Sequence, residues 1–201
     1  MYIEMMLLLN LISKNKTFDG TQLVYSHYSE ACNCDMTFGL FMPDISERKE
    51  IPILWFLSGL TCNHENAMTK SGAQTWAAEK GLAVIFPDTS PRGSDVPDDD
   101  SFDLGQGAGF YLDASEDPWS KNFNMETYIK HELSELVFKN FNLDKSRQGI
   151  TGHSMGGNAA IRGVNYFGKQ ATKNGTKSKL HSVYVSGYVL TLRENILKAS
   201  K

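Results

Sequence analysis

Gly152-His153-Ser154-Met155-Gly156 is the stretch that decides the fold, because it has the form Gly-x-Ser-x-Gly. In this motif the serine sits on a strained turn between a β-strand and an α-helix, with its hydroxyl exposed at the end of a sheet. Glycines at the two outer positions let neighbouring backbones come close, so side chains there are expected to collide. The motif predicts that Ser154 is a nucleophile, whereas a small residue in a tight turn is the plainer interpretation.

The sequence on both sides of the motif fits a strand, a turn and a helix. Residues 147–151 form a short strand candidate, and residues 157–161 supply small residues and helix formers. We therefore expect Ser154 to lie between the two elements.

Two apolar runs further upstream, residues 51–57 and 82–87, are typical of strands buried on both faces. Residues 75–80 between them have helical character. Two buried strands joined through a helix predict a parallel sheet with helices on both faces. Since sites in such sheets lie at the carboxyl ends of the strands, Leu60 and Ser154 are expected at one edge.

Four blocks of sequence then occur in a characteristic order, and they read ILWFLSGLTC (53–62), FPDTSPRG (86–93), GAGFYLDA followed by DPW (107–119) and GHSMGG (152–157). This set resembles the S-formylglutathione hydrolases, also called esterase D, from about Lys14 to about Ile161. The resemblance implies an α/β-hydrolase fold and no cofactor. It also implies a cytoplasmic enzyme of formaldehyde detoxification, which hydrolyses the thioester S-formylglutathione to glutathione and formate.

General chemistry assigns roles to the residues around the motif. Ser154 would attack an ester or thioester carbonyl, and the backbone N–H groups of Met155 and Leu60 would stabilise the resulting oxyanion. Cys62 lies beside Leu60, and an accessible thiolate there would make the site sensitive to alkylation or oxidation. A buried, inert cysteine is the other interpretation. Tyr111 and Trp119 either shape an acyl pocket or simply pack.

The remainder of the catalytic triad is harder to find. The fold places its residues in the chain order Ser, then Asp or Glu, then His. After Ser154 the sequence contains no aspartate, and His181 precedes Glu194, which reverses that order. We interpret His181 as the residue before a strand at 182–186, and Glu194 as a solvated helix residue.

Two functional hypotheses therefore stay open. The first is a serine hydrolase of the S-formylglutathione hydrolase type that also has carboxylesterase activity. The alternative is an inactive, truncated remnant that acts as a binding or dimerisation partner of a complete paralogue. A related carboxylesterase or acyltransferase with the same motif is a third possibility.

The predicted domain organisation follows from the extent of the resemblance. Residues 1–13 are interpreted as an extension and residues 14–201 as one incomplete α/β-hydrolase domain, which is family-like over 14–161 and divergent over 162–201. We expect this domain to lack its last strands. Because an unpaired strand edge recruits other chains, association or homo-oligomer formation is expected.

Composition limits the remaining possibilities. The 201 residues carry a formal net charge of −3, which gives no attraction to nucleic acid or to an anionic membrane. The apolar stretch at residues 5–12 is too short to span a bilayer. Three cysteines, an odd number, fit a reducing compartment and no disulfide scaffold.

Several other residues attract attention without supporting a site. His64 is interpreted as a surface polar residue, His153 as a packing or hydrogen-bonding residue, and His131 as an exposed position on an amphipathic helix at 125–138. Residues 98–100 are three consecutive aspartates whose spacing matches no calcium loop, so no metal is predicted.

Overall fold

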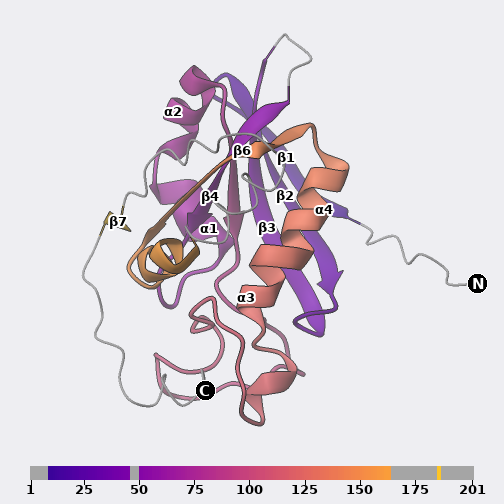
Figure 1. The fold of residues 1–201 in the computed structure, drawn as a ribbon, viewed down its shortest axis with the longest axis vertical. Helices are drawn as coiled ribbons and strands as arrows, with labels where there is room; N and C mark the ends of the chain where they lie inside the picture. The colour runs from indigo at the N-terminus through magenta and orange to yellow at the C-terminus, as the bar shows by residue number, and fades with distance from the viewer. Residues whose placement is uncertain (1–8, 46–49, 164–184, 187–201) are drawn as a thin grey trace, which may run out of the picture.

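The structure, a computed structural model, describes residues 9–45, 50–163 and 185–186, and its centre is one mixed β-sheet (Figure 1). The sheet has seven strands in the order β1-β2-β3-β5-β4-β6-β7. Their bounds are β1 Asn10–Thr17, β2 Gly20–Ser29, β3 Cys34–Pro43, β4 Ile51–Leu57, β5 Ala83–Pro87, β6 Leu143–His153 and β7 Val185–Ser186. The helical segments are α1 His64–Lys70, α2 Ala73–Lys80, η1 Trp119–Lys121, α3 Met125–Thr127, η2 Tyr128–Leu133 and α4 Ser134–Asn140.

The part of the sheet that carries the Gly-x-Ser-x-Gly motif is parallel, as predicted. β4 pairs in parallel with β5 on one side and with β6 on the other, and β6 pairs in parallel with β7. The other three pairings, β1 with β2, β2 with β3 and β3 with β5, are antiparallel. The sheet is therefore mixed, not mostly parallel, because a short turn joins β2 to β3 and such a turn can connect only antiparallel neighbours.

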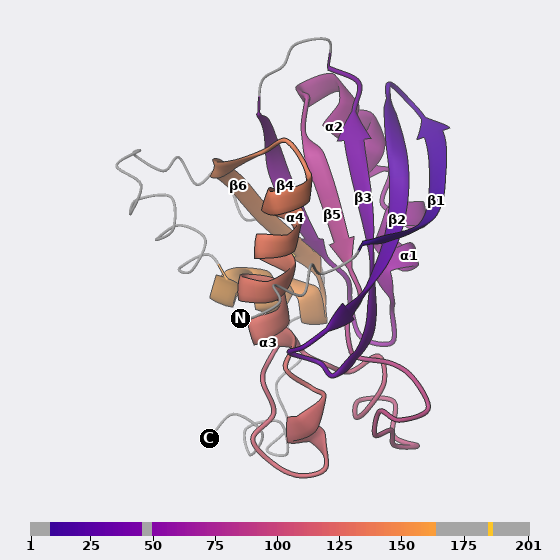
Figure 2. The same cartoon turned by 90° about the vertical axis from the view of Figure 1, so that its right-hand side faces the viewer.

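Helices cover both faces of this sheet, as predicted (Figure 2). Helix α4 lies on one face, and α1 and α2 lie on the other. Alternate residues of β4 serve the two layers: Ile53, Trp55 and Leu57 belong to the cluster under α4, whereas Leu54 and Phe56 pack in the cluster under α1 and α2. An apolar run without alternation is what a strand buried on both faces requires.

The predicted amphipathic helix at 125–138 is confirmed as the continuous run of α3, the π-helical η2 and α4. Its predicted apolar stripe is buried, with Ile129, Leu133, Leu136 and Val137 each at most 4% exposed. His131 is exposed, as expected. Side chains of this helix form part of the larger buried apolar cluster, which also contains Met155 and Ala159 from the segment after the motif.

The two ends of the chain qualify the predicted boundaries. β1 begins at Asn10, so the last part of the predicted 1–13 extension is an edge strand of the sheet. Part of the strand expected at 182–186 is present as β7, beside Gly152 and His153. His181, Glu194 and most of the tail 162–201 lie outside the described residues.

A buried histidine links β2 to the helix. His27 Nε2 lies 3.1 Å from the Tyr128 hydroxyl, and His27 Nδ1 lies 3.0 Å from the Tyr28 carbonyl oxygen. Since a carbonyl can only accept, Nδ1 carries the proton and Nε2 accepts from Tyr128. Burial lowers the pKa of His27, against the opposing effects of the Tyr28 carbonyl, Glu132 and Asp35. The neutral ring therefore satisfies both of its contacts.

We predict that this ring makes the fold less stable in mild acid. A base with a lowered pKa binds protons more readily in the unfolded chain, so its contribution is complete above the unfolded value of 6.5 and is lost as the pH falls below it. The slope from one such group is at most about 1.4 kcal/mol per pH unit. Urea unfolding at about pH 7.5 and about pH 5.5 measures this difference.

The matched variant is His27→Gln, which keeps polar atoms in place but does not titrate in this range. It should be less stable than the wild type at the higher pH and should lose less stability on acidification. Part of the slope should persist, because burial also lowers the pKa of His64. An unchanged slope in His27→Gln would show that His27 is not responsible.

Candidate active site

The motif forms the strand, turn and helix that the sequence predicted. β6 ends at His153, Ser154 occupies the turn with φ 53°, and residues 155–163 are helical. The Asn158 N–H donates to the Ser154 carbonyl oxygen at 3.1 Å, which closes the first helical turn. A positive φ is uncommon for a residue with a side chain and is a form of strain found at functional sites.

The two outer glycines are required by close backbone contacts, as predicted. A Cβ atom at Gly152 would lie 2.3 Å from the carbonyl carbon of Gly156. A Cβ atom at Gly156 would lie 2.0 Å from the carbonyl oxygen of Leu57. These contacts bring the end of β4 directly against the turn that carries Ser154.

Leu60 and Ser154 lie at the same edge of the sheet. Leu57 and Gly152 are register partners in the parallel pair β4–β6, so the segments that follow them leave the sheet together. A Cβ atom at Gly59 would be 3.4 Å from the Cβ atom of Ser154. Ser154 itself is half-buried, and no hydrogen bond joins its hydroxyl to another residue in the described part of the chain.

Met155 is the first helical residue after this turn, and Leu60 follows Gly59, which packs against Ser154. Within the described ranges, the Leu60 N–H donates to no backbone carbonyl. The Met155 N–H belongs to the first residue of the helix, where N–H groups have no partner inside the helix. Free backbone donors beside a serine hydroxyl are the arrangement that stabilises an oxyanion.

The loop at 58–62 is tied to the loop that contains residues 107–111. Tyr111 is 4% exposed, and its hydroxyl donates to the Ser58 carbonyl oxygen at 3.1 Å. The Thr61 N–H donates to the Gly107 carbonyl oxygen at 3.0 Å. Burial raises the pKa of Tyr111 well above its ordinary value, so the phenol stays protonated and keeps donating. Tyr111 thus packs inside the protein and braces the backbone beside Leu60.

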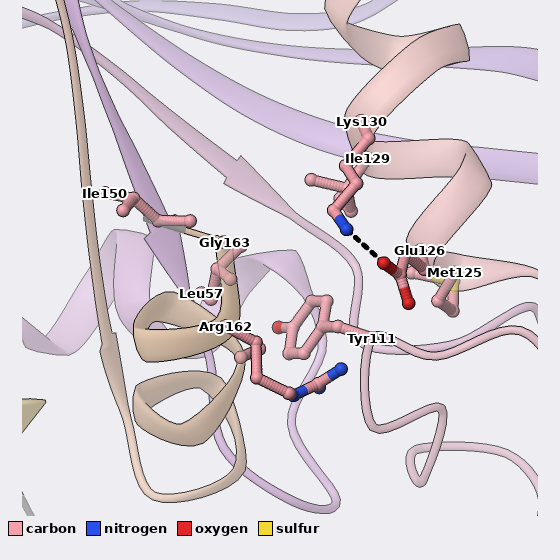
Figure 3. Close-up of a pocket in the computed structure, with 10 residues that line it drawn as sticks. Leu57, Tyr111, Met125, Glu126, Ile129, Lys130, Ile150, Arg162 and Gly163 are labelled. Atoms are coloured by element: carbon pink, nitrogen blue, oxygen red, sulfur yellow. Dashed lines mark hydrogen bonds and ion pairs between the residues drawn. The ribbon is translucent and has the colours of Figure 1, made fainter. Parts of the chain in front are cut away.

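A small, partly open hollow lies next to the helix that follows Ser154 (Figure 3). Tyr111 and Arg162 line one side of it, and the ion pair between Glu126 and Lys130 lines the other. The Arg162 guanidinium donates to the Phe110 carbonyl oxygen at 2.7 Å, which ties the helix at 155–163 to the loop before Tyr111. The remaining lining residues are Leu57, Met125, Ile129, Ile150, Ala159 and Gly163. Trp119 is not among them and packs edge-on against Phe123, with ring centroids 5.2 Å apart.

Three other candidate residues, Cys62, His153 and His64, lie in different environments. Cys62 is a half-buried free thiol at the end of the 58–62 loop. His153 is exposed. His64 was expected to be a surface polar residue but is half-buried at the start of α1, where its Nδ1 atom is buried without a hydrogen-bond partner. Its position in the sequence did not indicate that it would be buried near Asp88 and Arg92, whose charges act on it.

The three consecutive aspartates at residues 98–100 do not form a metal-binding site. Asp98, Asp99 and Asp100 are exposed, and Asp98 accepts a hydrogen bond from the Gln106 N–H at 2.8 Å. In the described part of the chain, no three His, Cys, Asp or Glu side chains are grouped as metal ligands would be. Nor does any helix in these ranges have the length and apolar character needed to cross a membrane.

The turn at residues 152–156 that carries Ser154 is called the elbow below. The fold and the elbow define the class of the protein: it has an α/β-hydrolase fold with a serine at the strand-to-helix turn. The chain belongs to the Esterase family, whose model matches residues 29–170. It is also 60% identical over 150 residues to the S-formylglutathione hydrolase of Paracoccus denitrificans, an alignment that covers 75% of this chain and 54% of that protein. The resemblance predicted from the four sequence blocks is confirmed.

Comparison with solved structures agrees. An S-formylglutathione hydrolase from Agrobacterium tumefaciens matches with a TM-score of 0.77 and 45% identity, over 88% of this chain and 61% of that one. The Staphylococcus aureus serine hydrolase FphF matches with a TM-score of 0.59 and 20% identity, over 82% of this chain and 55% of that one, and supports the fold alone. The chain thus spans 54% and 61% of the two S-formylglutathione hydrolases that it matches.

Proposed function

We propose that this protein is a serine hydrolase that cleaves S-formylglutathione to glutathione and formate, with carboxylesterase activity on simple esters. The observation that carries the proposal is the position of Ser154. It sits at φ 53° on the elbow, with Gly59 of the neighbouring loop packed against it. The identity to S-formylglutathione hydrolases supports the choice of substrate.

The proposed chemistry uses few atoms. The Ser154 Oγ atom attacks the thioester carbonyl carbon, and the carbonyl oxygen becomes an oxyanion. The N–H groups of Leu60 and Met155 stabilise that charge. When the oxyanion collapses, the C–S bond breaks, the proton lost by Ser154 passes to the glutathione sulfur, and a formyl-serine remains. Water then releases formate and restores the hydroxyl. The charge develops only in the transition state, so fixed donors placed there lower the barrier.

No described residue is assigned as the general base that would take the proton from the Ser154 hydroxyl. A neutral serine needs one to react at neutral pH. Beyond Ser154 the sequence holds no aspartate, and its histidine there, His181, lies outside the described residues. The second candidate is a protein that does not turn over substrate and acts as a binding or dimerisation partner of a complete paralogue.

Turnover separates the two candidates. Release of thiol from S-formylglutathione, or of a chromogenic phenol from an acetate ester, should proceed over many cycles and depend on Ser154. A single burst or no reaction would instead support the remnant.

We further propose that the protein acts in the cytoplasm and that chains associate through the edge of the sheet.

Cys62 gives a separate prediction for this function. Its backbone is part of the loop that carries Leu60, and its thiol is half-buried. Alkylation with iodoacetamide should therefore slow turnover by about tenfold or more, because the added group crowds the loop. Cys62→Ser should remain active and become resistant, whereas equal inactivation of this variant would place the sensitive residue elsewhere. Cys32, which is fully buried with its pKa raised to about 12, serves as an internal unreactive control.

A further inference from the structure

The loop at 58–62 is held in a strained conformation. Thr61 has φ 65°, a left-handed conformation that is an outlier for a β-branched residue. Such strain persists only where surrounding contacts fix it. One contact lies inside the loop, where the Cys62 N–H donates to the Gly59 carbonyl oxygen at 3.3 Å. The others come from outside.

The contact at the end of this loop is made by an arginine. The Arg92 Nη2 atom donates to the Cys62 carbonyl oxygen at 2.8 Å. The Thr89 hydroxyl donates to the same oxygen. The Cys62 carbonyl therefore has two external donors, and both come from the segment that follows β5.

A buried carboxylate aims the arginine. The Arg92 Nε atom lies 3.1 Å from each carboxylate oxygen of Asp88, whose side chain is 7% exposed. The Thr89 N–H also donates to Asp88, at 2.6 Å. Burial raises the pKa of Asp88, while Arg92 and the Thr89 N–H oppose that effect. Because the guanidinium is planar, fixing Nε on Asp88 also fixes the direction of Nη2 toward Cys62.

We propose that Arg92, oriented by Asp88, is a positioning residue that sets the Leu60 N–H for the oxyanion. The inference rests on the proposed function. An oxyanion donor must lie about 2.7–3.1 Å from the developing charge, so a small shift of the loop removes its contribution. Within the described residues Arg92 makes no hydrogen bond to Ser154 or Leu60, and it acts through the Cys62 carbonyl.

The test uses Arg92→Lys and Arg92→Gln. Lysine keeps a cation beside Asp88 but lacks the planar fork that serves Asp88 and Cys62 together. We expect kcat to fall about tenfold to a hundredfold in both variants, with KM within about twofold. This loss is smaller than the roughly hundredfold to thousandfold typical of removing one oxyanion donor, because the Leu60 N–H is displaced and not removed. The matched control is Arg147→Gln, which removes an exposed arginine that pairs with Asp144 away from the loop, and it should change neither constant.

A second measurement does not need turnover. Hydrogen–deuterium exchange of a peptide that spans residues 58–62 should be faster in both Arg92 variants than in the wild type, while peptides from β4 and β5 exchange as before. This comparison also detects a variant that has simply failed to fold, because exchange would then rise throughout. Arg92→Lys is the variant expected to stay folded, since Asp88 keeps a cation beside it.

The outcomes are distinguishable. Wild-type exchange at 58–62, or a raised KM with unchanged kcat, would overturn the positioning role of Arg92. If Ser154→Ala retained wild-type turnover, the proposed function would fail, and the exchange experiment alone would still decide whether Arg92 holds the loop. Lower kcat, unchanged KM and local loss of protection together support the inference.

Discussion

Ser154→Ala should abolish ester and thioester turnover. In serine hydrolases with an intact triad, removal of the nucleophile lowers kcat by about a millionfold, and what remains comes from the oxyanion donors and substrate binding. The alanine removes only one oxygen atom from a half-buried position that has no recorded hydrogen bond to another described residue. Stability should therefore change little, and the loss can be assigned to chemistry. Thiol release from S-formylglutathione and phenol release from an acetate ester are the measurements.

Ser120→Ala is the control for this experiment. Its hydroxyl donates to Asp117 in the loop around η1, away from the elbow. Turnover in this variant should equal that of the wild type. If Ser154→Ala and the wild type hydrolysed the substrate equally fast, another residue would be the nucleophile. If neither turned over, the chain would be the inactive remnant.

Gly156→Ala should prevent normal folding of the elbow. The added Cβ would lie 2.0 Å from the Leu57 carbonyl oxygen and 2.6 Å from that of Ser58, and both contacts are with backbone. No side-chain rotation relieves such an overlap, so β4 and the helix at 155–163 must separate. We expect a loss of at least about 3 kcal/mol in the free energy of unfolding, measured by urea denaturation, together with loss of turnover.

Gly149→Ala is the matched control, in β6 just before the turn that carries Ser154. Its added Cβ would lie 3.2 Å from the end of the Leu54 side chain, which can move. The stability should change by less than about 1 kcal/mol, since alanine also restricts the unfolded chain. Equal stability of Gly156→Ala and Gly149→Ala would mean that β4 does not press against the elbow.

The elbow was predictable because each part of it leaves a local signal. The glycines at 152 and 156, the strand before them and the small residues after them all indicated one conformation. The apolar runs at 51–57 and 82–87 lack alternation, which indicated strands buried on both faces. The parallel pairing of β4 with β5 followed from these runs, since a helical connection between two buried strands favours a parallel pair.

The contacts that brace the site were not predictable in the same way. Asp88 and Arg92 stand four residues apart in one of the quoted blocks, a spacing that suggests only a local ion pair. The contact of Arg92 with the Cys62 carbonyl depends on how two loops meet after β4 and β5. His64 was misjudged for the same reason, because its burial arises from tertiary packing and not from its neighbours in sequence.

The antiparallel half of the sheet was also missed. The burial pattern of β3 shows near-continuous burial, and β2 is similar in its middle, so alternation gave no sign of antiparallel pairing. The turn at residues 30–33, with Asn33 at φ 48°, decides the direction. Asparagine tolerates this left-handed conformation better than most residues, and that was the available signal.

The central claim is that Ser154 is an activated nucleophile, and covalent labelling tests it most directly. A fluorophosphonate probe reacts with an activated serine hydroxyl, and digestion followed by mass spectrometry locates the adduct. The account predicts one adduct per chain, on the peptide that contains Ser154, and none in Ser154→Ala. Labelling on another residue, or an unlabelled wild-type chain, would contradict it.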